Sequence, residues 1–176
     1  MQIVLPWNQG IVKYQSEFAA LQTEHPGRCP LCGCTKFHKW GKYERYVVEE
    51  SRYHRISIQR TRCVKCGKTH SYLPSFCVSR LCYGADFIMA TLNALILKLR
   101  CSFEDHKRRA YAFLRRFRES ENLWLTFLRS RGFGNIPARK KERAAKIFTA
   151  LLKIYKEENF LSDFLRETGR HFMCAK

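Results

Sequence analysis

Two matching turns decide the fold of this chain: Cys29-Pro30-Leu31-Cys32-Gly33 and Cys63-Val64-Lys65-Cys66-Gly67. In each turn two residues separate the cysteines, and a glycine follows that can adopt the positive φ the turn requires. Each turn directs two thiolates at one point, so together they supply the four sulfurs of a closed tetrahedral zinc site. We therefore predict that Zn²⁺ is bound by Cys29, Cys32, Cys63 and Cys66. The alternative, a pair of disulfides, is disfavoured because nothing in the sequence indicates secretion.

The other cysteines and the nearby histidines are weaker candidates for ligands. Cys34 is an alternative to Cys32, but the two-residue spacing of Cys32 is the one that closes the turn. Because four thiolates already saturate zinc, we expect His38 and His70 to be surface groups or neighbours of the ligands. The remaining thiols are expected to be packed or free: Cys77, Cys82, Cys101 and Cys174. A second, weaker metal site at Cys77 and Cys82 is the alternative for that pair.

The charge of the chain points to an anionic partner. Among 176 residues, 33 are Lys or Arg and 15 are Asp or Glu, which gives a formal net charge of +18 spread along the sequence. Nucleic acid is the first candidate for the partner, and an anionic membrane surface is the second. Aromatic residues make up 14% of the chain, so the charge is carried by a folded scaffold. The longest apolar run, within Phe87–Leu99, is too short and polar to span a bilayer, and we expect a cytoplasmic protein.

The sequence divides into three parts. Residues 1–27 predict an N-terminal arm with a short helix over Gly10–Thr23. Residues 28–80 predict an antiparallel zinc ribbon, with a strand and turn at Lys36–Tyr43 and further strands at Tyr46–Val48 and Tyr53–Arg62. In the last strand, alternation places Ile56, Ile58, Arg60 and Arg62 on one face. Such a small ribbon buries little apolar area, so we expect metal binding to supply its folding energy.

Residues 81–176 predict a helical part. The apolar periodicity indicates helices at Ala85–Arg100, Phe103–Arg109, Tyr111–Glu119, Glu121–Arg131, Ala138–Glu157 and Phe160–Glu167. The segment Tyr111–Glu119 is either a separate helix or a continuation of the helix before it. Residues 85–119 are a candidate helix-turn-helix, because a short turn joins helices of which the last is rich in arginine. The alternative is an ordinary amphipathic helix with a solvated basic face. The fold class we predict is α+β, a small zinc ribbon followed by an all-helical part.

Basic and aromatic residues interleave in the ribbon and continue into the following helices, as they do on surfaces that contact phosphates and bases. The candidate nucleic-acid contacts are Lys36, Lys39, Lys42, Arg45, Arg60, Arg62, Lys65, Lys68, Lys107, Arg108, Arg109, Arg115, Arg116 and Arg118. The candidate stacking residues are Trp40, Tyr43 and Tyr72. We predict no catalytic residues, because a closed four-thiolate site leaves no open metal position and no catalytic motif is present.

The run from Cys29 to Tyr83 resembles the zinc-ribbon, DNA-binding front end of bacterial insertion-sequence transposases and of related transposon-associated proteins. The resemblance is carried by Cys29–Gly33, His38–Arg45, Arg60–His70 and Leu73–Phe76. It implies that the four cysteines bind zinc, that the Lys/Arg face meets DNA, and that a helix-turn-helix follows. The transposases continue into a nuclease domain with three spaced carboxylates. Here the three aspartates, Asp86, Asp105 and Asp163, each fall within a predicted helix. We therefore expect no nuclease fold in these residues.

These observations together predict a non-catalytic, zinc-dependent protein that binds double-stranded DNA and is associated with a mobile element. Two alternatives stay open. In the first, the chain is an accessory subunit of a larger nucleoprotein complex, and apolar stripes of its helical half, such as Trp124, Phe127 and Leu128, dock a protein partner. In the second, the chain binds RNA, because zinc ribbons and basic helices bind RNA as well as DNA.

Overall fold

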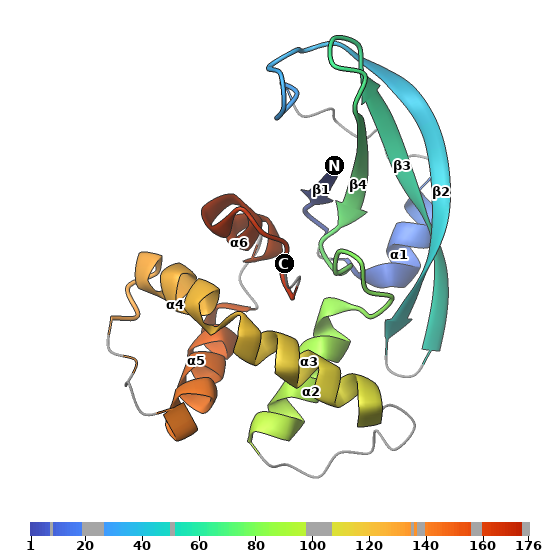
Figure 1. Cartoon of the computed structure of the whole chain (residues 1–176). Helices are drawn as coiled ribbons and strands as arrows, with labels where there is room; N and C mark the ends of the chain where they lie inside the picture. The colour runs from blue at the N-terminus through green and yellow to red at the C-terminus, as the bar shows by residue number, and fades with distance from the viewer. Residues whose placement is uncertain are drawn as a thin grey trace.

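The computed structural model describes residues 1–7, 9–18, 27–49, 52–97, 107–134, 136, 140–155 and 160–173. The fold is α+β, with a curved four-stranded sheet followed by helices (Figure 1). In chain order the elements are β1 (Gln2–Leu5), α1 (Gly10–Glu17), β2 (Phe37–Glu49), β3 (Arg52–Cys63), β4 (Thr69–Pro74), α2 (Ala85–Ile96), α3 (Lys107–Glu119), α4 (Glu121–Ser130), α5 (Lys140–Tyr155) and α6 (Phe160–Thr168). None of the helices in the described ranges has the length and apolar character needed to cross a membrane.

The sheet has the strand order β1-β4-β3-β2, and its N-terminal strand comes from the segment predicted as an arm. Strand β1 pairs in parallel with β4, with Gln2 opposite Ser71 and Leu5 opposite Pro74. The N-terminal ammonium of Met1 adds a 2.7 Å hydrogen bond to the Thr69 carbonyl. The first residues therefore complete the sheet. The predicted helix over Gly10–Thr23 begins as expected, and its last residues lie outside the described ranges.

Strand β2 is a single strand of 13 residues where the sequence predicted a strand, a turn and a second strand. It pairs with β3 on both sides of Gly41, and the register shifts between Lys39 and Lys42. Gly41 has a φ of +75°, a value that glycine adopts without strain. The glycine that predicted a turn therefore sits at a β-bulge, which bends the strand without ending it.

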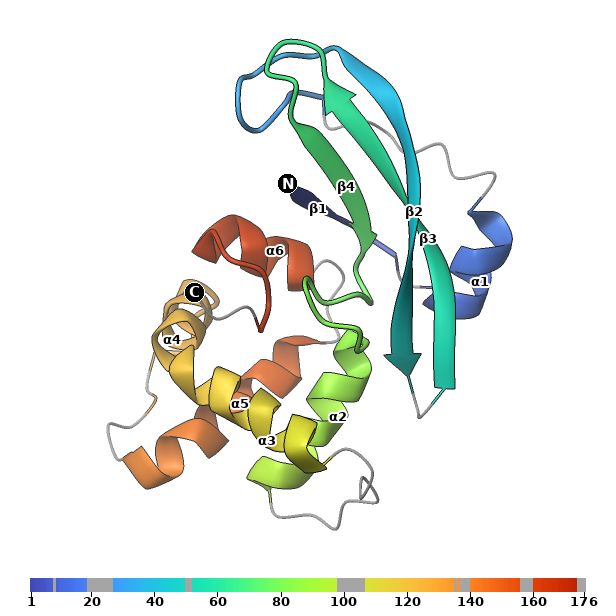
Figure 2. The same cartoon turned by 45° about the vertical axis from the view of Figure 1, so that its right-hand side comes forward.

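The two faces of the sheet are covered by different parts of the chain. Figure 2 shows α1 on one side of the sheet and the other helices on the opposite side. On the α1 side, Ile11 and Tyr14 pack with Ile56 and Ile58 of β3 in one apolar cluster. Near the cysteine turns the opposite face of β3 becomes the buried one. Its buried residues there are Thr61 and Cys63, which alternate out of phase with Ile56 and Ile58. The face that carries Arg60 and Arg62 is thus open at the cysteine end of the sheet, as the alternation predicted.

The helices enclose a second apolar core around the fully buried Trp124. Its indole N–H donates a 2.9 Å hydrogen bond to the Phe117 carbonyl, and its ring packs on Phe117, Phe164 and Phe172. The Trp124, Phe127 and Leu128 stripe, which the sequence offered as core or docking surface, is therefore core. Helix α3 is continuous from Lys107 to Glu119, so of the two alternatives for Tyr111–Glu119 the structure adopts the continuation of the preceding helix. The first residues of the predicted Phe103–Arg109 helix lie outside the described residues.

Candidate metal centre and its basic surroundings

The two cysteine turns adopt the same backbone conformation. The Gly33 amide donates to the Cys29 carbonyl at 2.8 Å, and the Gly67 amide donates to the Cys63 carbonyl at 3.0 Å. Both glycines have left-handed backbones, with φ of 71° and 66°. The first turn precedes β2 and the second joins β3 to β4, so strand pairing brings the two turns together at one end of the sheet.

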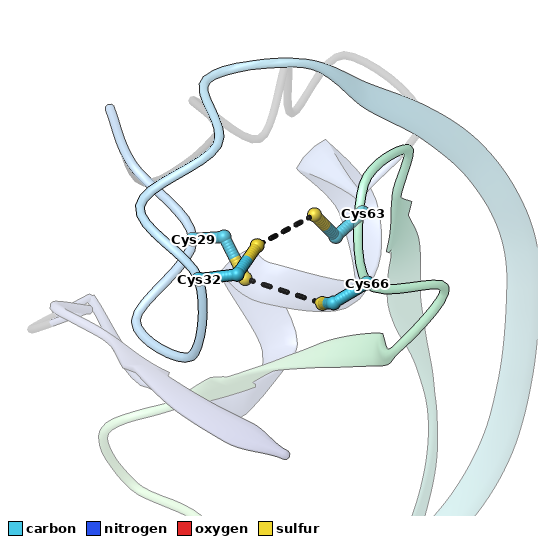
Figure 3. Close-up of side chains that lie close together, drawn as sticks. All are labelled: Cys29, Cys32, Cys63 and Cys66. Atoms are coloured by element: carbon cyan, nitrogen blue, oxygen red, sulfur yellow. Dashed lines mark hydrogen bonds between the residues drawn. The ribbon is translucent and has the colours of Figure 1, made fainter.

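The four predicted ligands lie together and point at one another (Figure 3). The Sγ atoms of Cys29 and Cys66 are 3.8 Å apart, those of Cys32 and Cys63 are 3.5 Å apart, and all four lie within 4.8 Å of one another. A tetrahedral ion with metal–sulfur bonds of ~2.3 Å would set its ligands about 3.8 Å apart. The cysteines of the described ranges are free thiols, so the disulfide alternative is not adopted. The quartet has the donor set and the spacing that a metal ion requires.

Two thiols of the cluster, Cys63 and Cys32, have pKa values shifted in opposite directions. The backbone amide of Cys66 hydrogen-bonds to the Cys63 thiolate and lowers the pKa of that thiol to about 6, against desolvation, which raises it. At Cys32 the backbone amide of Cys34 also lowers the pKa, but desolvation and hydrogen bonds to the other three thiols raise it to about 12. The metal-free cluster therefore keeps a proton. Because metals bind the thiolate form, a divalent cation would displace that proton.

His70 is a neighbour of the cluster and not a member of it. Its side chain is fully buried, and its Nε2 lies 3.4 Å from the Cys29 Sγ. Burial lowers the pKa of the imidazole, which favours the neutral ring. The edge of Phe37 packs against that ring, with the centroids 5.9 Å apart. His70 therefore supports the Cys29 corner from β4, while His38 is exposed on β2.

The remaining thiols lie outside the quartet. The Cys34 Sγ accepts a hydrogen bond from the Lys36 amide at 3.4 Å, so it caps its own loop. Cys77 is buried in the α1 core, and burial raises the pKa of its thiol to about 12. Cys82 is exposed, and the described residues include no metal-binding group at Cys77 and Cys82. The predictions for Cys101 and Cys174 lie outside the described residues.

Two arginines of β3 stack on two aromatic residues of β2 beside the cluster. The Arg62 guanidinium lies 4.5 Å from the centroid of the Trp40 ring, and Arg60 lies 5.7 Å from that of Tyr43. Arg62 also donates its Nε–H to the carbonyl of Gly67 at 3.0 Å, which ties it to the second cysteine turn. The exposed lysines of this end are Lys36, Lys39, Lys42, Lys65 and Lys68. The structure therefore brings most of the predicted ribbon contacts close to the metal-binding quartet.

Two predicted contacts have structural roles instead. Tyr72 is 2% exposed, and its hydroxyl hydrogen-bonds to that of Thr61 at 3.0 Å, so its ring is not available to stack on a base. Arg45 is half-buried and donates to the carbonyls of Val78 and Leu81. Arg45 thereby holds the loop before α2 against the sheet. The sequence missed both roles because each depends on a partner far away along the chain.

The arginines predicted in the helical part lie on α3, away from the cysteine turns. Arg108, Arg115 and Arg118 are exposed with Tyr111 on the side opposite the buried residues Ala110, Phe113 and Phe117. Arg116 is half-buried, and the exposed Arg109 hydrogen-bonds to the Tyr83 hydroxyl and stacks on its ring. The side chain of Lys107 lies outside the described set. Figures 1 and 2 place α3 at the opposite end of the molecule from the two turns. The predicted contacts thus form two separate basic regions.

Comparison with known proteins gives one match. Residues 29–112, just under half of the chain, match a family described as a domain of unknown function (DUF6431). The matched region begins at Cys29, the first cysteine of the candidate metal site, and ends within α3. No curated protein and no solved structure matches the chain.

Proposed function

We propose that this is a non-catalytic, zinc-dependent nucleic-acid-binding protein whose ligand is double-stranded DNA. The observation that carries the proposal is the position of Arg62, which contacts both the second cysteine turn and the exposed ring of Trp40. A metal ion in the quartet would fix that turn and, through it, the basic and aromatic surface of β2 and β3. The net charge of +18 requires an anionic partner, and this surface has the groups that contact phosphates.

Zinc is the metal we propose. Four thiolates with tetrahedral spacing select zinc or iron, and zinc is the usual ion where two such turns close a structural site. Four protein ligands would leave no open position for water, so the ion would act as a cross-link and not as a catalyst. Two such turns at one end of antiparallel strands are the arrangement expected of a zinc ribbon. Together with the resemblance to transposases, this arrangement supports the proposal of a role on mobile-element DNA.

The helical part would extend the contact with DNA. Helix α3 bears exposed arginines along one side and is the last helix of the unit predicted over residues 85–119. We propose α3 as the DNA-facing helix of a helix-turn-helix-like unit. The second candidate function, docking of a protein partner, is favoured by Tyr111, which is 63% exposed on α3 beside the half-buried Leu114.

The test is a salt titration of duplex binding by the zinc-loaded protein, with its metal content measured in parallel. If about six phosphates are neutralised, log affinity should fall with log salt at a slope near −5. Changing Lys65→Gln and Lys68→Gln together should reduce that slope by about 2. The control removes the same charge from α5, with Lys146→Gln and Lys153→Gln, and should leave the slope unchanged. A slope near zero, or equal effects of the two pairs, would refute the proposal. Competition with structured RNA tests the RNA alternative.

A further inference from the structure

We infer that Trp40 and Arg62 form a stacking site for one unpaired base of single-stranded DNA. The inference goes beyond the proposed function, because it assigns to one site an unpaired base, a ligand that a duplex does not offer. Its basis is the arrangement of a bulge, an exposed indole ring and a fixed guanidinium on the open face of the sheet. The site is distinct from the phosphate contacts, which need only charge.

The β-bulge presents the indole ring. Trp40 lies within the register shift between Lys39 and Lys42, next to Gly41 with its positive φ. Bulges redirect side chains out of the regular alternation of a strand. Trp40 is 44% exposed although it is the largest residue on this strand. A large aromatic ring at the surface of a basic sheet is what base-stacking platforms provide.

Arg62 is fixed against the ring by two contacts. Its guanidinium lies 4.5 Å from the ring centroid, and its Nε–H donates to the Gly67 carbonyl at 3.0 Å. The contact with the ring places the Trp40 and Arg62 side chains on the same face of the sheet. The cation is attracted to the π face of the indole, and the contact orders both side chains before a ligand arrives. An ordered platform loses less side-chain entropy when a base stacks on it.

The chemistry favours an unpaired base over a duplex. In a duplex both faces of each base are covered by neighbouring bases, so only an unstacked base offers a face to the indole ring. The neighbouring Tyr43 is half-buried and packs against the α1 core, so it offers less ring surface than Trp40. One base therefore occupies the site, and the exposed Lys42, on the same strand as Trp40, and Lys65, in the second cysteine turn, would supply phosphate contacts.

The experiment compares two oligonucleotides that carry equal charge. One is a 15-mer of thymidine, and the other is a 15-mer of abasic residues with the same phosphates. Base stacking on an aromatic side chain contributes about 1–3 kcal/mol, which corresponds to about 5- to 150-fold in affinity. We expect the thymidine 15-mer to bind more tightly than the abasic 15-mer by a factor in that range and to quench tryptophan fluorescence. Trp40→Leu should abolish the difference while the affinity for the abasic strand stays unchanged.

Matched variants separate stacking from folding and charge. Trp7→Phe changes another tryptophan, one that hydrogen-bonds to the Gly10 carbonyl, and should keep both the preference and the quenching. Trp40→Phe retains a π face and should keep part of the preference. Equal binding of the two strands by the native protein, or equal losses for both strands in Trp40→Leu, would overturn the inference. Tighter binding of a uridine RNA 15-mer would overturn the assignment to DNA. If the native protein binds duplex DNA with the expected salt dependence but binds the two 15-mers equally, the proposed function stands and the stacking site fails.

Discussion

Removal of the metal should release the first cysteine turn and leave the helices folded. The sulfurs are the main link between this turn and the sheet, and Leu31 at its tip is 57% exposed. Among the described residues, the other hydrogen bonds from residues 27–36 to the sheet and second turn join Cys29 to His70 and Lys36 to Val64. The helices, by contrast, have an apolar core of their own around Trp124.

The size of the effect follows from these contacts. Two hydrogen bonds contribute about 2 kcal/mol in total, so the Gly33 amide in metal-free protein should be protected from exchange only about 30-fold. With a structural zinc ion, which contributes roughly 10–16 kcal/mol in small zinc peptides, the amide should exchange only through global opening. A global stability of at least ~5 kcal/mol then gives protection of about 4 × 10³-fold or more. Chelation should therefore accelerate exchange at Gly33 by about 100-fold or more.

The assay is amide hydrogen exchange measured by NMR on the metal-loaded protein, the chelated protein and Cys66→Ser. The Trp124 amide, which donates to the Ser120 carbonyl at 3.1 Å within the helical core, serves as the internal reference. Cys34→Ser removes a thiol outside the quartet and should keep both the metal and the protection of Gly33. If Trp124 loses protection as fully as Gly33, the metal supplies the folding energy of the whole chain and the argument is wrong. If Gly33 stays protected after chelation, the quartet does not hold the turn.

The remaining predictions concern the core, the sheet and a histidine. Trp124→Ala should lower the unfolding free energy by about 3–5 kcal/mol in urea denaturation, because it removes a buried ring and the donor to the Phe117 carbonyl; a loss below ~1 kcal/mol would contradict this packing. Tyr72→Phe should cost about 1–2 kcal/mol by removing the hydroxyl partner of Thr61, with nucleic-acid affinity unchanged; weaker binding at equal stability would return Tyr72 to the interface. Burial lowers the pKa of His171 below its usual 6.5, so the unfolded state takes up a proton more readily. Its stabilising contribution is then full above pH 6.5 and is lost as the pH falls through the folded-state pKa. His171→Gln should reduce the fall in melting temperature between pH 7.5 and 5.5. An unchanged dependence of melting temperature on pH would refute the contribution of His171.

Local spacing in the sequence was enough to predict the metal-binding quartet and the coarse fold. The backbone of each turn is set within five residues, because Gly33 and Gly67 bond to the carbonyls of the cysteines that open their turns. The α+β class followed from periodicity, since strand alternation and helical spacing are both short-range patterns. The open basic face of β3 followed in the same way, because Arg60 and Arg62 alternate in phase with Ile56 and Ile58.

Long-range pairing lay beyond the sequence. Nothing in residues 2–5 shows that they pair with β4, because a strand of four residues carries no mark of a partner about 70 positions away. Gly41 predicts a turn as well as a bulge, and the pairing of β2 with β3 on both sides of it decides between them. Tyr72 and Arg45 are residue types that often contact nucleic acid at a surface. Here they instead form hydrogen bonds within the protein, to the neighbouring strand and to the loop before α2.

The sequence by itself determined which atoms can bind a metal and that the chain carries a large positive charge, because residue type and short spacing fix donor chemistry and local backbone. Only the tertiary structure decided which cations share a surface. It placed the ribbon cations beside the quartet and the α3 arginines at the far end of the molecule. The physical reason is that a side chain's exposure depends on what covers it, and the covering elements α1, β1 and the helices come from distant parts of the chain.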